Sequence, residues 1–142
     1  MPLDRQVEFR TDFFLPIVDE ERETNPGVYG KALATWVKAK LEERGLQAED
    51  IIPEDFGWVV PVSRKPFRLW LGCANLEEST SQWSIFPVAE LSLLQRIYRR
   101  PETEPALQLL WGHVRELVHS IPGVSNVHWV EPARMAQKGD VE

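Results

Sequence analysis

The chain has 142 residues, of which 43% are hydrophobic and 27% charged, and these are the proportions of an ordinary globular protein. Its 22 acidic and 16 basic side chains give a formal net charge of −6, a sign that opposes non-specific attraction to nucleic acid or anionic lipid. We therefore expect neither nucleic acid nor a membrane among its partners.

The cysteine content and the N-terminal sequence bear on the cellular compartment. The single cysteine, Cys73, excludes an intrachain disulfide and is typical of a protein in a reducing environment. The first residues lack the basic start and apolar run of a signal peptide, and no apolar stretch is long enough to span a bilayer. We therefore expect a cytoplasmic protein.

The first strand signal covers residues 6–13, in which Val7, Phe9 and Phe13 share one side and polar residues share the other. This period of two predicts a strand with one solvated face. Pro16 ends the segment, and we interpret the acidic run 19–23 as a solvated loop.

A helix follows, with Asn25 as its predicted N-cap, Pro26 in its first turn and Gly45 at its C-terminal end. Its apolar positions recur every three or four residues, which predicts one face toward a core. These positions are Tyr29, Leu33, Trp36, Val37 and Leu41.

Three strand candidates come next in quick succession, at residues 56–62, 67–74 and 82–88. The two connections between them are short and polar, as an antiparallel meander requires. Pro61 and Pro87 each lack an N–H, so we expect both near strand ends or at bulges.

Residues 89–100 fit either a short helix or an extended connection, and Pro101 closes the segment. Arg96, Arg99 and Arg100 make it a local basic exception in an acidic chain. We interpret these arginines as the solvated end of a helix, since phosphate contacts usually involve larger sets of basic side chains.

The strongest periodic signal predicts a second long helix that begins near Thr103, carries Pro105 in its first turn and ends at Pro122-Gly123. Its apolar stripe is Leu107, Leu110, Trp111, Val114, Leu117, Val118 and Ile121. A last strand over residues 124–131 follows, and we expect 133–142 to be a mobile polar tail.

The predicted element order is β-α-β-β-β-(α)-α-β. Helices with one apolar stripe and strands with one polar face predict an α+β fold, a two-layer sandwich with two main helices on one face of a mainly antiparallel sheet of about five strands. We expect residues 1–132 to form this single domain. The first β-α-β unit also allows its two strands to lie parallel, joined by a right-handed crossover.

The six tryptophans each mark either a core or a binding surface. The periodic patterns place four of them in the core: Trp36, Trp58, Trp83 and Trp111. Phe56 and Val60 share the predicted inner strand face with Trp58. The alternation around Trp129 leaves its side open.

Trp70 is the candidate for function. Phe67, Leu69, Leu71 and Cys73 form the apolar face of their strand, so Trp70 is predicted on the opposite, open face beside Arg68. Exposed Trp with Arg is typical of interface hot spots, and a neighbouring glycine lets a partner approach closely. The simpler alternatives are stacking of Trp70 on an arginine, or cover by residues 89–100. The candidate partner-binding residues are Trp70, Arg68, Gly72, Arg10 and His128.

Sequence patterns for catalysis, metal binding and phosphate binding are not present, so we expect no metal or cofactor. Cys73 lies on the apolar strand face without an adjacent cation, which favours an inert buried thiol over a nucleophile. His113 and His119 lie about 240° apart around one helix and cannot form one site. Glu54 and Asp55, directly before an aromatic stretch, are the candidate residues of a ligand site.

These features favour a non-enzymatic protein-interaction module of adaptor, chaperone-like or inhibitor type. We expect it to bind a protein partner or a second copy of itself through the open sheet face or edge near Trp70. One alternative is a small-molecule-binding domain with an aromatic and acidic cleft near residues 54–58. The other is an enzyme of unknown class that uses Cys73 or His128.

Overall fold

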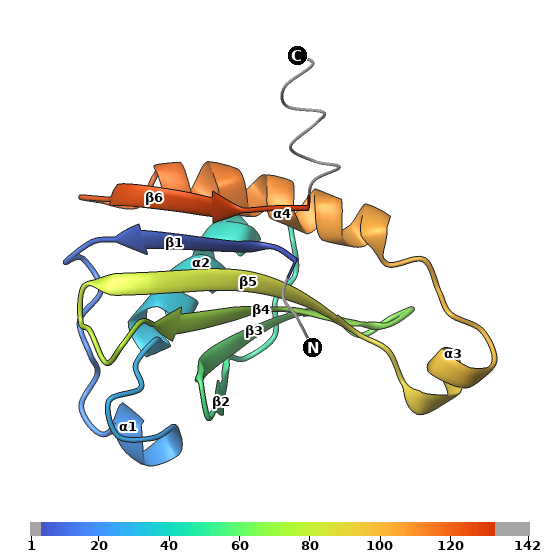
Figure 1. Cartoon of the computed structure of the whole chain (residues 1–142), viewed down its shortest axis with the longest axis horizontal. Coiled ribbons are helices and arrows are strands. Elements are labelled where there is room, and N and C mark those ends of the chain that lie inside the picture. Colours follow the sequence, from blue (N-terminus) through green and yellow to red (C-terminus); the bar gives the residue numbers. More distant parts are fainter. Residues whose placement is uncertain (1–3, 133–142) are drawn as a thin grey trace.

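A computed structural model describes residues 4–132, and the strands in this range form one open sheet (Figure 1). Its strands are β1 (Gln6–Arg10), β2 (Ile52–Glu54), β3 (Gly57–Ser63), β4 (Arg68–Asn75), β5 (Gln82–Glu90) and β6 (Ser125–Val130). They lie in the order β2-β3-β4-β5-β1-β6, and each pair of neighbours runs antiparallel. The predicted α+β class is confirmed, with six strands in place of about five. The predicted polar tail, 133–142, lies outside the described residues.

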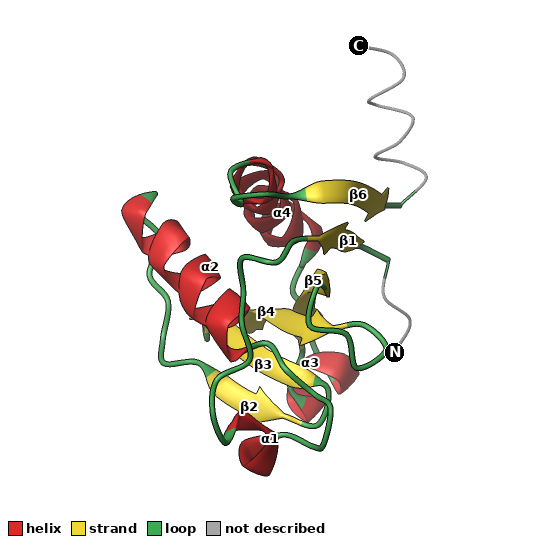
Figure 2. Ribbon diagram, turned by 90° about the vertical axis from the view of Figure 1, so that its left-hand side faces the viewer, coloured by secondary structure: helices red, strands yellow, loops and turns green. Residues whose placement is uncertain are grey.

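Two long helices, α2 (Lys31–Glu43) and α4 (Glu104–His119), pack on the same face of the sheet, and Figure 2 shows both on one side of it. Their apolar stripes and the inner faces of the strands form the core. The short helices α1 (Glu20–Glu23) and α3 (Leu93–Ile97) lie outside these two layers. Within residues 4–132, none of the helices combines the length and the apolar character needed to cross a bilayer.

The central meander β3-β4-β5 follows the three predicted strands closely. Pro61 lies at a register shift between β3 and β4, where a missing N–H is tolerated. Pro87 instead lies inside β5, two residues beyond Ile85, where the pairing of β5 with β1 ends. Strand β2 has no counterpart among the predicted strands, because three residues that include a proline carry too short an alternating pattern.

The first strand ends earlier than predicted, at Arg10. The Thr11 hydroxyl donates to the carbonyl of Pro122 at 2.7 Å and accepts from the amide of Phe13 at 3.1 Å, and so turns the chain. Phe13 is therefore exposed, and Phe14 enters the core with its ring edge-on to Trp83. The turn shifts the alternation of side chains by one residue, so Phe14 points to the core in place of Phe13.

Strand β1 lies between β5 and β6, so the parallel pairing allowed by the sequence is not formed. Val7 faces Ile85 on one side and Trp129 on the other. The chain leaves β1, passes through α2 to the far edge, and returns by antiparallel steps that end beside β1. The N-terminal strand thus joins the meander to the C-terminal strand.

Helix α2 begins at Lys31 rather than at Pro26, and its N-cap is Gly30. The predicted cap, Asn25, instead donates from its side chain to the carbonyl of Asp55 at 3.3 Å. Gly30 has φ 154°, and a Cβ added there would lie 2.4 Å from the carbonyl oxygen of Cys73. Only glycine allows the start of α2 to approach β4 this closely, but glycine has no side chain to cap the helix.

Glu20 supplies the missing cap, although it belongs to the acidic run predicted as a solvated loop. This residue begins α1 and is only 1% exposed. Its Oε1 accepts hydrogen bonds from the amides of Gly30 and Lys31 and from the indole of Trp58, each at 3.1 Å. Its Oε2 accepts from the amide of Ile17 at 2.6 Å. Four donors and the positive end of the helix dipole offset the cost of burying this carboxylate.

The C-terminal half confirms the second long helix. Helix α4 starts at Glu104 after Thr103, with Pro105 in its first turn. The buried guanidinium of Arg5 pairs with Glu104, which joins the start of β1 to the start of α4. Between β5 and α4 the chain forms α3, so the helical alternative for residues 89–100 is correct.

Replacement of Glu20 should test how strongly its carboxylate stabilises the fold. We expect Glu20→Ala to lower the free energy of unfolding by about 3 kcal/mol, because it removes a helix cap and leaves buried N–H donors without an acceptor. Glu23→Ala is the matched control in the same short helix, where an exposed pair with Lys31 contributes at most about 1 kcal/mol. Urea unfolding measures both, and equal losses would contradict the role of Glu20.

Candidate binding surface

The structure sorts the tryptophans largely as predicted. Trp58, Trp83 and Trp111 are buried in the core, whereas Trp36 is half-buried and packs against its edge. Trp129, undecided from sequence, lies on the core side of β6, where its ring meets Trp111 edge-on at 5.7 Å. Leu69 and Leu71 point into the core under α2 and α4, so Trp70 between them is half-buried on the opposite face of the sheet, which we call the open face.

Three aromatic rings gather on the open face. Trp70 stacks on Phe56 with centroids 6.1 Å apart, Phe86 meets Trp70 edge-on at 6.3 Å, and Phe56 and Phe86 lie 5.4 Å apart. We call these residues the aromatic cluster. Such pairs have the geometry of favourable aromatic contacts, and they give the open face an apolar centre.

Phe56 reaches the cluster from the turn between β2 and β3. Its predicted place on the inner face beside Trp58 is wrong, because β3 begins one residue later, at Gly57. Glu54 pairs with Gly57 across the hairpin, which leaves Phe56 in the two-residue turn. The turn folds its ring back over β4 and β5.

Gly72 lies under the ring of Phe86 rather than under open space. A Cβ added to Gly72 would lie 2.3 Å from Cζ of Phe86. The two residues are direct neighbours across β4 and β5, so the aromatic ring covers the backbone of the glycine. The close approach predicted at Gly72 is therefore made by a side chain of the same protein.

Trp70 and Arg68 share one acidic partner. The Trp70 indole donates to Glu90 at 3.3 Å, and the Arg68 guanidinium donates to the other carboxylate oxygen of Glu90 at 3.4 Å. Arg68 is exposed, so this ion pair contributes little to stability. Of residues 89–100, the first two end β5, and α3 lies beyond that end (Figure 1), where Gln95 donates to the carbonyl of Pro66.

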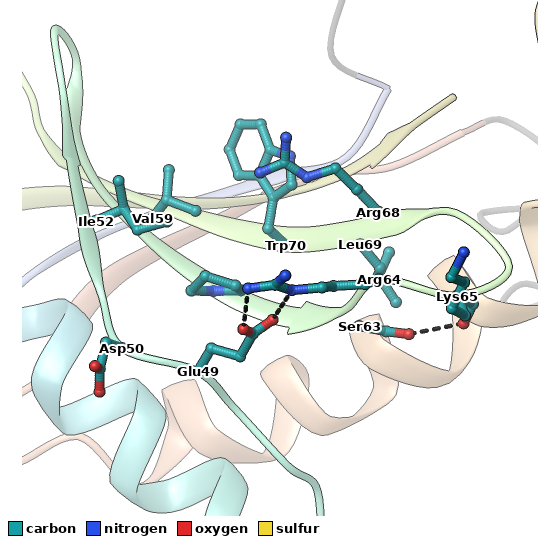
Figure 3. A pocket seen from close by; sticks show the side chains of 11 residues that line it. Glu49, Asp50, Ile52, Val59, Ser63, Arg64, Lys65, Arg68, Leu69 and Trp70 are labelled. Atoms are coloured by element: carbon teal, nitrogen blue, oxygen red, sulfur yellow. Dashed lines mark hydrogen bonds and ion pairs between the residues drawn. The ribbon is translucent and has the colours of Figure 1, made fainter. Parts of the chain in front are cut away.

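A groove of about 940 Å³ adjoins Trp70 (Figure 3). Ile52, Val59 and Pro61 contribute apolar side chains, whereas Arg64, Lys65 and Arg68 bring positive charge. In Figure 3 the side chains of Trp70 and Arg68 lie on one side of Arg64 and the Glu49 carboxylate on the other. The groove therefore offers an aromatic wall, an apolar floor and charged rims.

Arg64 and Glu49 form a bidentate ion pair at the rim, with nitrogen–oxygen distances of 2.6 and 2.9 Å. These hydrogen bonds hold the pKa of the Glu49 carboxyl below its ordinary value. The pair joins the loop after α2 to the turn between β3 and β4. Lys65 in the same turn is exposed, and its ammonium extends the positive rim.

The other predicted partner-binding residues lie away from the aromatic cluster. Arg10 faces Gln82 across β1 and β5, whereas Trp70 faces Val88, six residues farther along β5. His128 is exposed on β6 and faces Glu8, with β1 and β5 between it and β4. The structure thus brings together Trp70, Arg68 and Gly72 and separates Arg10 and His128 from them.

The residues considered for ligand binding and catalysis are also dispersed. Glu54 and Asp55 are exposed in the β2–β3 hairpin, and neither is among the residues that line the groove. Cys73 is buried on the core face of β4. His113 accepts a hydrogen bond from Arg44 at 2.9 Å. Within residues 4–132, no three His, Cys, Asp or Glu side chains gather in a way that could hold a metal ion.

Comparison with known proteins gives no match: no family model fits the sequence, and no curated protein or solved structure is significantly similar to it.

A double-mutant cycle tests the packing of Phe86 on Gly72. We expect Gly72→Ala to lower the free energy of unfolding by about 1 kcal/mol, because the new Cβ must displace the ring. In the Phe86→Ala background the same change should be neutral or stabilising, since alanine restricts the unfolded chain more than glycine does. Urea unfolding of the four proteins gives the coupling, and an equal cost in both backgrounds would contradict the contact.

Thiol reactivity tests the burial of Cys73. Burial raises the pKa of the Cys73 thiol, so the reactive thiolate is suppressed in the folded protein. We expect a chromogenic disulfide reagent to modify Cys73 at pH 8 no faster than the protein unfolds, and at once in denaturant. Stoichiometric labelling of the folded protein within minutes would contradict this and would support an enzyme that uses Cys73.

Proposed function

We propose that the protein is a non-enzymatic interaction module that binds a partner protein through the aromatic cluster and the adjoining groove. The single observation that carries this proposal is the position of the cluster. Phe56, Trp70 and Phe86 lie on the sheet face that α2 and α4 leave uncovered, beside an apolar floor with charged rims. Aromatic anchors surrounded by polar side chains are the composition of interface hot spots.

The geometry also indicates the kind of segment that would fit. Trp70 and Phe56 present ring surface, while Arg68 and Lys65 at the rim can meet carboxylates of a partner. A short extended segment that carries an apolar side chain next to an acidic residue would satisfy both features. The buried free thiol of Cys73 is compatible with the reducing cytoplasm, where we propose that the protein acts.

A peptide selection tests this proposal and does not require the natural partner to be identified. Displayed random peptides are selected on the folded wild-type chain, and their affinities are then measured for variants of matched fold stability. We expect Trp70→Ala to weaken the selected peptides by about 30-fold, the loss of roughly 2 kcal/mol typical of a hot-spot residue.

Two substitutions serve as controls for that selection. Leu109→Ala removes an exposed apolar side chain from α4, and Arg10→Ala removes a charge from the far end of the open face. Neither should change affinity by more than about twofold, since neither residue adjoins the cluster. Peptides that bind Trp70→Ala as tightly as wild type would contradict the proposed surface.

A second candidate function is the binding of a small anionic molecule in the groove. It is favoured by the groove volume of about 940 Å³ and by three basic side chains at its rim. A screen of small carboxylates and phosphates by thermal shift tests it, because a ligand that binds the folded state raises the melting temperature. A rise that is lost in Lys65→Ala/Arg68→Ala would favour this candidate over protein binding.

A further inference from the structure

The segment between β5 and α4 carries a group of unpaired apolar side chains. We call residues 91–103 the arm; it contains α3, whose start is fixed by a capping box between Ser92 and Gln95. Four large side chains in this short stretch are between 63 and 80% exposed: Leu93, Leu94, Ile97 and Tyr98. A capped helix that holds apolar side chains in water is typical of an interaction surface.

The arm is also basic, in contrast to the rest of the chain. Arg96, Arg99 and Arg100 are exposed beside the four apolar residues, and none of the three forms an ion pair within residues 4–132. The whole protein has a formal net charge of −6. The arm is therefore a positive and apolar projection from a negative body.

A second exposed surface has the opposite charge. We call residues 12–23, between β1 and the end of α1, the acidic loop. Four of its apolar side chains are between 41 and 87% exposed: Phe13, Leu15, Ile17 and Val18. They are interspersed with exposed carboxylates at Asp12, Asp19, Glu21 and Glu23. The loop thus combines apolar contact area with the charge that complements the arm.

The arm and the acidic loop lie at opposite ends of the molecule. Figure 1 shows α1 and α3 at the two ends of its long axis, both on the side of β2, and Figure 2 shows them again on that side. The two surfaces of one chain therefore cannot contact each other. A second copy rotated by a two-fold axis through this side would place each arm on the acidic loop of the other copy.

We propose that the protein self-associates through these two surfaces, with the arm of one copy docked on the acidic loop of another. The two surfaces carry opposite charges and both expose apolar area, so a second copy of this chain is the partner that fits both of them. The contact is distinct from the aromatic cluster, so Trp70→Ala should leave the association constant unchanged.

Sedimentation velocity over a range of protein concentrations tests the proposal directly. We expect wild-type protein to form a concentration-dependent dimer, and high salt to weaken it because charged groups meet at the contact. Leu94→Ser/Ile97→Ser in the arm and Val18→Ser in the loop should each reduce association at least tenfold. Leu109→Ser is the matched control, because Leu109 is 69% exposed on α4 and lies outside both surfaces.

Charge reversal identifies which surfaces meet. Arg96→Glu/Arg99→Glu makes the arm acidic, and Asp12→Lys/Glu21→Lys/Glu23→Lys makes the loop basic. Each variant alone should be monomeric, since its arm and its loop then carry the same sign. An equimolar mixture should recover a heterodimer, because both contacts between the two variants are again between opposite charges.

Three results would overturn the proposal. Wild-type protein could remain monomeric at millimolar concentration. It could associate without any change in Leu94→Ser/Ile97→Ser. It could also remain monomeric and instead co-sediment with vesicles of phosphatidylcholine and phosphatidylserine, with vesicle binding that depends on Ile97. The arm would then be assigned to a lipid surface.

Discussion

The buried carboxylate of Glu20 is the interaction on which the arrangement of α2 and β3 depends. Gly30 is required for close approach of α2 to β4, and the same glycine leaves the helix without a cap. Glu20 caps it from ten residues upstream and also accepts from the indole of Trp58 on β3. One side chain thereby joins the N-terminal loop, the first long helix and the sheet, so removal of its charge should loosen all three together.

The indole N–H groups of the tryptophans find their hydrogen-bond acceptors in different places on the two faces of the sheet. Trp58, Trp83 and Trp111 lie in the core and donate to Glu20, to the carbonyl of Thr11 and to Glu131. Their polar atoms are satisfied, so these large rings can fill the helix-covered face. Trp70 donates to Glu90 at the sheet surface instead, which leaves its ring available on the open face. Three tryptophans thus fill the covered face of the sheet, and Trp70 presents ring surface on the other face.

Much of the fold could be predicted from periodicity, but most of the site could not. The alternation around Leu69 and Leu71 places Trp70 on the open face, and the stripe of α4 predicts that helix. Phe56 joins the cluster only because the β2–β3 turn is two residues long, and β2 itself carries almost no signal. Glu20 resembles any residue of an acidic run, since its partners, Gly30 and Trp58, come from distant segments. Arg10 and His128 share the open face with Trp70 but lie far from it along and across the strands. That distance depends on the strand order, which the periodicity of the sequence does not reveal.

Helices α2 and α4 cover one face of the sheet, and Trp70 lies on the other, open face. A soluble nitroxide added during NMR measurement of the six indole N–H signals tests this arrangement. The signal of Trp70, assigned by its loss in Trp70→Phe, should broaden strongly, while those of Trp58, Trp83 and Trp111 should persist. Equal protection of Trp70 and Trp58 would contradict an accessible aromatic surface and would show that the open face is covered in solution.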